Sequence, residues 1–352
     1  MTTFLAIGLM SGTSLDGEID VALLETDGEA IVRPIDFRPY PYDAHVRDRV
    51  RACFGKRVSD EQTREAEKLV TDLHIEAVRA SGFQADIIGF HGQTITHDPA
   101  NALTWQLGDG AALARASGMD VICDFRQADI RAGGQGAPLI PLYHAALLTE
   151  HDKPAAILNL GGVANVTYAT ANGDIIAFDT GPANAMMDDF IRLRTGAPFD
   201  AGGETAARGK PDSATLEAFL SHPYFERPAP KSLDRNEWSA DMVSHLSTED
   251  GMATLMAMVS ASLEKAFEEA LPEKPQHVYA CGGGRKNTVL MDMLAKSRTV
   301  RPIEDLGRNG DAIEAEGFAY LAVRSKRGLP LTLPSTTGVR APQTGGVFHL
   351  CA

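Results

Sequence analysis

The chain has 352 residues, of which 44% are hydrophobic and 23% are charged, and this composition is ordinary for a globular protein. Because the chain is about twice as long as a typical domain, we expect two lobes that each have a core. The formal net charge of −14, from 33 basic and 47 acidic residues, argues against nucleic acid or an anionic membrane as the main partner.

The N-terminal residues predict a strand and not a targeting segment. Residues 4–7 are apolar, but no basic segment precedes them and glycines follow soon after, so we expect no signal peptide. No apolar run in the chain approaches the length that a membrane span needs. We therefore expect a cytoplasmic protein with no membrane partner.

The first predicted elements form a hairpin. Residues 3–7 and 19–24 are β-type runs, and the turn GLMSGTSLDG (8–17) joins them. The same design recurs at 155–168, where AAILNL, GGVAN and VTYA follow one another, before a further strand that leads into DTGPAN (179–184). The two units lie about 150 residues apart, and this spacing favours an old duplication of a whole domain.

Helical patterns separate these strands. Residues 60–82 place apolar side chains at three- and four-residue steps and end at a glycine, which predicts an amphipathic crossover helix. The strand 85–90 follows and ends at HGQT (91–94), where an α/β sheet presents polar groups. A second long helix at about 250–270 precedes HVYACGGGRKN (277–287), a strand, triple glycine and helix. This alternation predicts mixed sheets covered by helices on both faces.

Two segments have a different composition. Residues 197–238 are rich in glycine, proline and charge, and we expect an exposed excursion from the second lobe, ordered by its aromatic residues. The tail 329–350 contains too many prolines and glycines for a helix and predicts a loop and a short strand. We expect an N-terminal lobe of residues 1–125 with about 335–352, and a C-terminal lobe of residues 126–334.

The four cysteines give no sign of a metal site. Cys53, Cys123, Cys281 and Cys351 form no CxxC pair, and no closely spaced histidines complete a zinc set. We therefore expect buried free thiols.

Glycine-rich turns follow strands at 8–17, 161–165 and 282–287, and they carry hydroxyl or amide side chains. Backbone N–H groups in such turns can converge on phosphate oxygens. Each turn alone is also typical of a tight hairpin, but the set together favours a nucleotide site.

The common nucleotide motifs are absent from the sequence. Gly55 and Lys56 fail as a P-loop because Val50 stands where the first glycine belongs and Arg57 stands where Ser or Thr belongs. The triple glycine fails as a dinucleotide fingerprint because Asn287 replaces its last glycine.

Eight motifs in one order along the chain carry a family resemblance. Together they resemble the anhydro-N-acetylmuramic acid kinase family, which belongs to the superfamily of acetate kinase, sugar kinases, Hsp70 and actin. The resemblance implies an α/β fold of two duplicated actin-like (ribonuclease H-like) lobes, with mixed β-sheets flanked by helices and an interlobe cleft for ATP and substrate. The motifs are GLMSGTSLDG (8–17), GFHGQTITHDP (89–99), DFRQADIRAGGQGAPLIP (124–141), NLGGVANVT (159–167), FDTGPANAMMD (178–188), CGGGRKN (281–287), IEAEGFAYLA (313–322) and LPSTTG (333–338).

The resemblance implies an enzyme of peptidoglycan recycling, with a homodimer as its assembly. In the family's reaction, ATP and water open the 1,6-anhydro ring of anhydro-N-acetylmuramic acid and yield the 6-phosphate. An inverting glycosidase needs two carboxylates, one base and one acid. Here O6 is both the departing ring oxygen and the phosphoryl acceptor, so capture by the γ-phosphate can replace the acid and one carboxylate can suffice.

Asp179 matches the family's catalytic aspartate, and the resemblance implies that it activates the water. It stands at the end of an apolar strand and before a helix start. An aspartate before Thr-Gly-Pro is also typical of a turn or cap residue.

The resemblance also implies the residues that bind ATP. The first turn is expected around the β- and γ-phosphates, the second turn approaches from the other lobe, and the triple glycine lines the adenosine side. Asp16 is also typical of a turn. Mg²⁺ is expected because phosphoryl transfer needs charge neutralisation, but no ligand for it is predicted. The candidates are Ser11, Gly12, Thr13, Ser14, Leu15, Asp16, Gly17 and Glu18, then Gly161, Gly162 and Asn165, then Gly282, Gly283, Gly284 and Asn287.

Candidate sugar-binding residues follow two strands. Sugar hydroxyls and a lactyl carboxylate require neutral donors and one guanidinium, and Arg126 is the candidate for the carboxylate. Arg126 could instead form a structural salt bridge with Asp124 or Asp129. His91 and His97 are also typical of histidines that satisfy hydrogen bonds in loops. For Glu314, a place in the active site and a place outside it are equally compatible with the sequence. The candidates are His91, Gln93, Thr94 and His97, then Arg126, Asp129 and Gln135, and Glu314, which matches a family Glu-Ala pair.

The chain departs from the family pattern at two places. Ala183 stands where the family often has glycine, and KSLDRNEW (231–238) replaces the frequent KSTGRE. Substrate tolerance is therefore open. Three other functions remain: a related kinase for another carbohydrate or a carboxylic acid, a nucleotide-controlled binding module of the actin or Hsp70 kind, and a glycosidase that needs no ATP.

Overall fold

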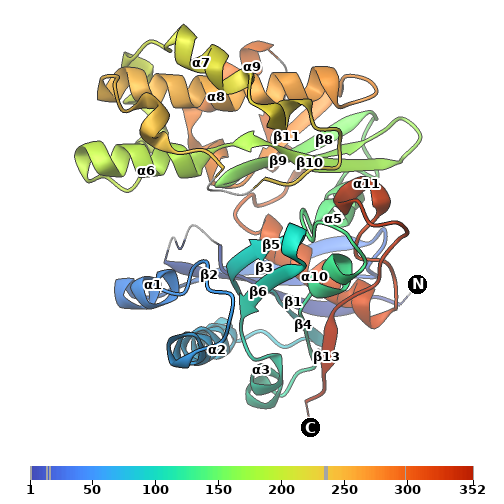
Figure 1. Cartoon of the computed structure of the whole chain (residues 1–352). Coiled ribbons are helices and arrows are strands. Elements are labelled where there is room, and N and C mark those ends of the chain that lie inside the picture. Colours follow the sequence, from blue (N-terminus) through green and yellow to red (C-terminus); the bar gives the residue numbers. More distant parts are fainter. Residues whose placement is uncertain (1, 13–14, 16, 234–236, 298, 352) are drawn as a thin grey trace. The chain divides into compact units, whose positions relative to one another are not determined.

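The chain divides into two compact units (Figure 1). The first unit comprises residues 1–149 and 312–352, and the second comprises residues 150–311. The computed structural model describes residues 2–12, 15, 17–233, 237–297 and 299–351.

These boundaries differ from the expected ones at 125/126 and 334/335. The difference arises from α10 (Ile313–Lys326), which packs on four strands of the first unit's sheet, and from α5 (Pro141–Leu147), which packs on α10. A pattern of apolar residues along these helices does not indicate which of two sheets they cover.

Among the described residues, the main sheet of the first unit has six strands in the order β13-β7-β4-β1-β2-β3. The first three strands in the chain pair antiparallel, and β4 and β7 continue the sheet in parallel from β1. Strand β13 pairs antiparallel with β7 at one edge. The strands are β1 (Phe4–Met10), β2 (Glu18–Thr26), β3 (Val32–Pro41), β4 (Ile87–Phe90), β7 (Val121–Cys123) and β13 (Val347–His349).

Helices cover both faces of this sheet, as expected. Because side chains alternate along a strand, Ile7 and Leu9 face the core under α2 and α3, whereas Gly8 faces α10. A Cβ atom at Gly8 would lie 1.7 Å from the carbonyl oxygen of Ala315, so α10 lies against the backbone of β1. The remaining helices of this unit are α1 (Ala44–Arg51), α2 (Glu61–Ser81), α3 (Gly110–Ser117), α4 (Gln127–Arg131) and α11 (Pro334–Thr337).

A separate two-stranded sheet follows β4. It consists of β5 (Gln93–Asp98) and β6 (Leu103–Leu107), which pair antiparallel, and the short helix η1 (Pro99–Asn101) joins them. The hairpin carries several of the predicted sugar-binding residues.

Among the described residues, the sheet of the second unit has five strands in the order β10-β9-β8-β11-β12. The long helix α8 packs against β10, α6, α7 and α9. The strands are β8 (Ala155–Leu160), β9 (Val163–Ala169), β10 (Ile175–Pro182), β11 (His277–Cys281) and β12 (Val300–Pro302). The helices are α6 (Asn184–Thr195), α7 (Ser213–Leu220), α8 (Thr248–Glu269), α9 (Thr288–Ser297) and the short η2 (Ala201–Gly203), η3 (Ala206–Arg208), η4 (Pro223–Glu226), η5 (Ala240–Val243), η6 (Gly283–Lys286) and η7 (Ile303–Leu306).

The two sheets repeat one design. In each, three consecutive strands pair antiparallel and the first of them then pairs in parallel with a fourth strand, which pairs in parallel with a fifth. Strands β1, β2, β3, β4 and β7 thus correspond to β8, β9, β10, β11 and β12. This shared order confirms the predicted duplication of an α/β lobe of the ribonuclease H-like type.

The two long predicted helices are confirmed nearly at their expected bounds. Helix α2 begins after Asp60, whose carboxylate accepts the N–H of Thr63, and it ends at Gly82 in the left-handed conformation (φ +67°). Helix α8 begins after Ser247, whose hydroxyl accepts the N–H of Asp250 at 3.0 Å. Among the described helices none is long and apolar enough to cross a membrane.

The segment 197–238 differs from the expected exposed excursion. Phe219, Tyr224, Phe225 and Trp238 are buried in the core of the second unit, together with residues of α8. The prediction of exposure was wrong for this part because its aromatic side chains contribute large apolar areas to the core.

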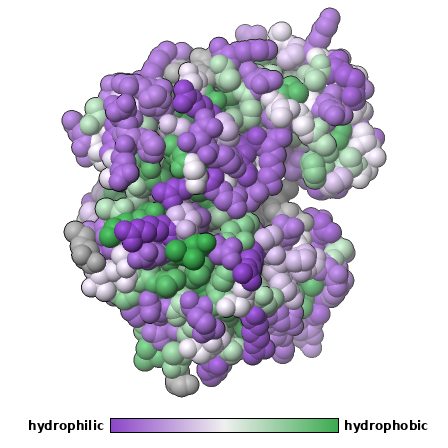
Figure 2. Space-filling model, turned by 180° about the vertical axis from the view of Figure 1, so that it is seen from behind, coloured by the Kyte–Doolittle hydropathy of each residue, from purple (hydrophilic) through white to green (hydrophobic). Residues whose placement is uncertain are grey.

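Two further expectations are corrected in part. None of the four cysteines forms a disulfide bond, but only Cys53 and Cys281 are buried, whereas Cys351 lies exposed near the chain end. The tail contains the predicted short strand β13 and also one helical turn, α11, which Pro334 begins at a position that tolerates proline. Figure 2 shows that hydrophilic and hydrophobic side chains are interspersed on the face drawn.

His74 of α2 generates a prediction about stability in acid. Burial lowers the pKa of this residue to about 4, and its ring lies against Phe90 while Nδ1 lies 2.7 Å from the carbonyl oxygen of Val70. The unfolded chain takes up this proton near pH 6.5, so stability is complete above that pH and is lost as the pH falls towards 4. His74 alone contributes a slope of up to about 1.4 kcal/mol per pH unit.

We expect the His74→Leu variant to lose less unfolding free energy than the wild type between pH 7 and pH 5.5 in urea titrations. The exposed His45 provides the control, since His45→Leu should keep the wild-type slope. Equal slopes in the wild type and His74→Leu would contradict this origin of the acid sensitivity.

Candidate functional site

A row of polar side chains crosses the sheet of the second unit. Asp179 of β10 is the register partner of Asn165 of β9, Asn165 partners Asn159 of β8, and Asn159 partners Cys281 of β11. Partners in register lie on the same face of a sheet. The carboxylate therefore stands at the edge-strand end of this row, and two carboxamides and a thiol follow it.

Asp179 is held from several sides. The residue is 7% exposed, and its Oδ2 accepts the N–H of Leu233 at 2.8 Å. Its own N–H donates to the carbonyl of Lys231 at 2.9 Å, and the hydroxyl of Tyr224 donates to its carbonyl. A β-bulge at Thr180 follows directly, and such bulges often redirect a side chain next to a site. The N-cap of α6 is Ala183, so Asp179 does not cap that helix.

The turn at Gly161 and Gly162 receives the start of α6. The N–H of Asn184 donates to the carbonyl of Gly161, and the N–H of Ala183 donates to that of Gly162, each at 3.0 Å. The side chain of Asn184 donates to the carbonyl of Leu160 at 2.8 Å. Asn184 was not among the predicted site residues, although its place after Gly-Pro-Ala at a helix start was a usable signal.

The triple glycine packs against the same strand end. A Cβ atom at Gly282 would lie 2.4 Å from Oδ1 of Asn159, and one at Gly284 would lie 2.7 Å from Cβ of Leu160. At Gly283 a Cβ atom would meet nothing nearer than Nδ2 of Asn184 at 3.8 Å. The predicted second turn and triple glycine thus lie together at the carboxyl end of β8.

Arg285 and Asn287 support this arrangement. The Arg285 side chain is 6% exposed, forms ion pairs with Glu304 (2.9 Å) and Asp311 (3.0 Å), and donates to the carbonyl of Gly282 at 3.0 Å. Asn287 was expected to line the adenosine side, but its Oδ1 accepts the N–H of Leu290 at 3.0 Å and begins α9. Asn287 therefore has a capping role in this structure.

The first turn, in the first unit, contains a buried hydroxyl. Ser11 is 3% exposed, and its Oγ has no hydrogen-bond partner among the described residues. Gly12 accepts the N–H of Leu15 at 3.1 Å and Nε2 of Gln93 at 3.4 Å through its carbonyl. A buried unpaired hydroxyl is costly unless a ligand completes it. Thr13, Ser14 and Asp16 lie outside the described residues.

The rest of this turn is fixed by packing. Leu15 has a positive φ of +51° and buries its side chain among Val46, Val50 and Val70. Gly17 has a φ of +101°, and its carbonyl accepts the N–H of Tyr42 at 2.7 Å. Glu18 is exposed at the start of β2. Leu15 therefore anchors the turn through its side chain.

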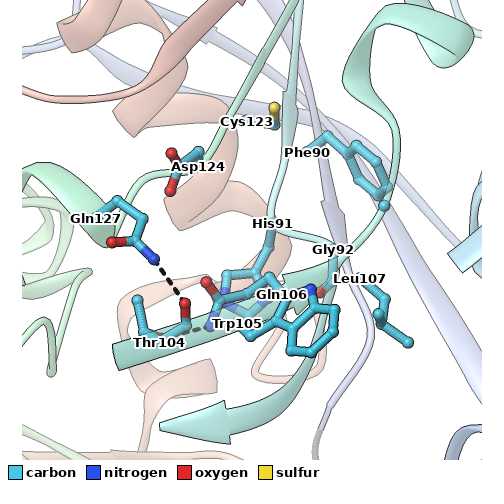
Figure 3. Close-up of a pocket in the computed structure, with 11 residues that line it drawn as sticks. Phe90, His91, Gly92, Thr104, Trp105, Gln106, Leu107, Cys123, Asp124 and Gln127 are labelled. Atoms are coloured by element: carbon cyan, nitrogen blue, oxygen red, sulfur yellow. Dashed lines mark hydrogen bonds between the residues drawn. The ribbon is translucent and has the colours of Figure 1, made fainter. Parts of the chain in front are cut away.

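A pocket of about 210 Å³ lies within the first unit between the carboxyl ends of β4 and β7 and strand β6 (Figure 3). Gln127 points towards Thr104 and donates to its carbonyl at 2.6 Å. Burial raises the pKa of Asp124, whose backbone has a positive φ of +55°. The lining residues are Phe90, His91, Gly92, Thr104, Trp105, Gln106, Leu107, Gly108, Cys123, Asp124 and Gln127. Of these only His91 was predicted. Phe90, Gly92, Asp124 and Gln127 lie within motifs of the family resemblance but were not among the candidates, and the others belong to segments with no motif of their own.

His91 is neutral and orients Arg126. Burial and the nearby Arg126 guanidinium hold the pKa of His91 well below its usual value. Its Nδ1–H therefore donates to the carbonyl of Gly92 at 2.8 Å, and its Nε2 accepts from Nε and Nη2 of Arg126 at 3.1 and 3.0 Å. Nη1 of Arg126 donates to the carbonyl of Gly136 at 2.7 Å.

Asp129 joins a loop to the tail. It is 1% exposed, and its carboxylate accepts the N–H of Gly136 at 2.6 Å and the hydroxyls of Thr332 and Thr337. The N–H of Gln135 donates to the carbonyl of Thr337 at 2.8 Å. These contacts give Asp129 a structural role, so contact with a sugar is not needed to explain it.

The other predicted sugar-binding residues are spread over the first unit. In the β5–β6 hairpin, Thr94 accepts from Gln106 at 3.2 Å, and Nδ1 of His97 lies 3.0 Å from the hydroxyl of Thr104. Glu314 is partly exposed in the first turn of α10.

Comparisons with known proteins give one consistent result. Residues 4–350 match the family described as "Anhydro-N-acetylmuramic acid kinase". The chain is 51% identical to the "Anhydro-N-acetylmuramic acid kinase" of Rhizorhabdus wittichii, over 99% of this chain and 100% of that one. It is 48% identical to the protein of the same name from Zymomonas mobilis, over 98% of this chain and 99% of that one. The protein of that name from Acidiphilium cryptum is also 48% identical, over 97% of both chains.

The packing at the end of β8 generates a prediction. Gly282 has a φ of +77° and a ψ of 171°, a conformation that strains any other residue. A Cβ atom there would also lie 2.4 Å from Oδ1 of Asn159, so Gly282→Ala introduces both strain and a clash. Gly307 also has a positive φ (+69°), but a Cβ atom there would meet nothing within 4 Å. We expect Gly307→Ala to cost about 1 kcal/mol of unfolding free energy, and Gly282→Ala to cost at least about 2 kcal/mol more.

Urea unfolding of the two variants beside the wild type checks this expectation. If Gly282→Ala were no less stable than Gly307→Ala, the close approach of the triple glycine to the end of β8 would be contradicted.

Proposed function

Since this chain belongs to the anhydro-N-acetylmuramic acid kinase family, we propose that it opens the 1,6-anhydro ring of anhydro-N-acetylmuramic acid with water and phosphorylates O6 with ATP. The products are N-acetylmuramic acid 6-phosphate and ADP, as peptidoglycan recycling requires. The observation that carries the proposal is the family match over residues 4–350, together with relatives about half identical over nearly their whole length.

Asp179 is the proposed general base. Its carboxylate accepts a proton from water while the water oxygen forms a bond to the anomeric carbon C1. The bond from C1 to O6 breaks, and O6 forms a bond to the γ-phosphorus as the bond to ADP breaks. The geometry supports this role because the carboxylate is fixed by the N–H of Leu233 and stands in a row with two carboxamides that can orient water or sugar hydroxyls.

The glycine-containing turns are the proposed phosphate-binding elements. Ser11 offers a buried hydroxyl with no partner among the described residues, and a phosphate oxygen would accept its hydrogen bond. The main chain is also open at three glycines, where an added Cβ atom would meet nothing within 3 Å. These are Gly161, Gly162 and Gly283. Such turns bind anions through backbone dipoles.

Mg²⁺ is proposed to arrive with the triphosphate. Among the described residues no three His, Cys, Asp or Glu side chains form a group that could hold a metal ion. Mg²⁺ commonly keeps several waters and binds mainly phosphate oxygens, so it needs few protein ligands. When bound, it neutralises charge on the phosphoryl group in transfer.

The sugar is proposed to use the first unit. Trp105 offers an apolar ring and Gln106 and Gln127 offer carboxamides at the pocket, a combination suited to a sugar. Arg126, oriented by His91, is the proposed partner of the lactyl carboxylate. A homodimer and a cytoplasmic location are also proposals, which rest on the family resemblance.

The role of Asp179 gives a direct prediction. We expect Asp179→Asn to lower kcat by at least about 100-fold, because an amide cannot accept the proton of the attacking water. The fold should be kept, since the amide oxygen can still accept the N–H of Leu233. Asp174→Asn, at the exposed turn before the same strand, is the matched control and should keep the wild-type rate. A wild-type kcat for Asp179→Asn would show that Asp179 is not the base.

Mass spectrometry of the product formed in ¹⁸O-labelled water tests the whole reaction. With Mg-ATP and the anhydro sugar, we expect a 6-phosphate that carries one ¹⁸O at C1, because water supplies that oxygen. An unlabelled product would contradict ring opening by water. Turnover of an ordinary sugar or carboxylic acid, with no reaction of the anhydro sugar, would favour a related kinase.

A further inference from the structure

A closed cycle of hydrogen bonds surrounds the proposed base. The N–H of Asp179 donates to the carbonyl of Lys231 at 2.9 Å. The ammonium group of Lys231 donates to the carbonyl of Tyr224 at 3.2 Å, and the hydroxyl of Tyr224 donates to the carbonyl of Asp179. Each of the three residues therefore holds the next one.

The same segment also reaches the carboxylate. Two residues after Lys231, the N–H of Leu233 donates to Oδ2 of Asp179 at 2.8 Å. Strand β10 lies at the edge of its sheet, so one side of its backbone has no neighbouring strand within the described part of the chain. Residues 224–233 supply hydrogen-bond partners to this edge strand at Asp179, the proposed base.

Lys231 occupies an unusual place for a lysine. It is 7% exposed, its Nζ donates to the carbonyls of Tyr224 and Phe225 at 3.2 Å each, and it lies 4.7 Å from the centre of the Tyr224 ring. Burial lowers the pKa of Lys231 to about 8. The charged groups that act on it are Glu269 and Lys265 of α8 and Arg227 after η4.

We propose that Lys231 is a positioning residue for Asp179: its ammonium group fixes the Tyr224 end of the segment, and the segment then holds both the backbone and the carboxylate of Asp179. This inference rests on the proposed function, since it assigns Lys231 to the base of that reaction. It also places Lys231 and Leu233, from the described part of KSLDRNEW (231–238), beside Asp179.

The physical reason is the geometry of proton transfer. A general base acts only within hydrogen-bond reach of the proton that it accepts, and a misplacement of about 1 Å can cost on the order of 100-fold in rate. A charged ammonium donates stronger hydrogen bonds than a neutral amine. Loss of its proton therefore weakens the cycle, and the rate should fall as the pH rises through about 8.

Lys231→Met tests the proposal because it removes the donor and keeps an unbranched apolar chain. We expect kcat to fall about tenfold with an unchanged KM for ATP, and we expect the alkaline fall near pH 8 to disappear from the profile of kcat. Tyr224→Phe removes only the hydroxyl and should lower kcat in the same direction. Lys274→Met, at an exposed lysine of the same unit, is the control and should match the wild type.

Hydrogen exchange supplies a readout that does not depend on turnover. The peptide Ile175–Pro182 should exchange faster in Lys231→Met and Tyr224→Phe than in the wild type or Lys274→Met. If both variants keep the wild-type kcat, pH profile and exchange, the proposal is overturned. If Lys231→Met fails to fold, Tyr224→Phe decides alone. A wild-type protein that does not convert the anhydro sugar would instead overturn the proposed function, and the exchange comparison would still test the positioning role.

Discussion

The close packing around the carboxyl end of β8 is the constraint on which the second unit's site depends. Gly282 and Gly284 lie so near Asn159 and Leu160 that a side chain on either glycine would overlap them. Asn184 joins from α6 by bonding the carbonyl of Leu160. Three segments that are far apart in the chain thus meet at one strand end, and main chain instead of side chains forms the surface there. Main-chain N–H groups in such a surface suit phosphates, whereas the proposed base stands on β10, two strands away in the same sheet.

The duplicated design explains how two lobes of the same fold present different chemical groups at equivalent positions. The turns β1–β2 and β8–β9 occupy equivalent places in the two sheets. The first turn is long and carries Ser11, whereas the second is reduced to Gly161 and Gly162 and receives the start of α6. The equivalent edge strands differ as well, since β3 is mostly exposed and β10 is buried with Asp179 near its end. Duplication therefore fixes the positions of these elements, and later sequence differences decide their chemistry.

The sequence allowed some of this to be predicted. The strand and turn units, the long helices and Asp179 could be found because each depends on residues that are adjacent in the chain. The row from Asp179 to Asn165 and Asn159 depends on strand register, and the contact between Asp179 and Leu233 joins residues 54 positions apart. Neither strand register nor a contact between distant residues produces a pattern that can be recognised in the sequence. The same reason explains why the lobe boundaries and the buried aromatic residues of 197–238 were not foreseen.

The cationic side chains near these elements are engaged with other groups of the protein, main-chain carbonyls among them. Arg126 donates to the carbonyl of Gly136, Arg285 to that of Gly282, and Lys231 to those of Tyr224 and Phe225. Donors engaged in this way brace loops and glycine-containing turns. Backbone dipoles alone carry only partial charges. In the proposed reaction, Mg²⁺ on the nucleotide supplies the positive charge that balances the phosphates in the transition state.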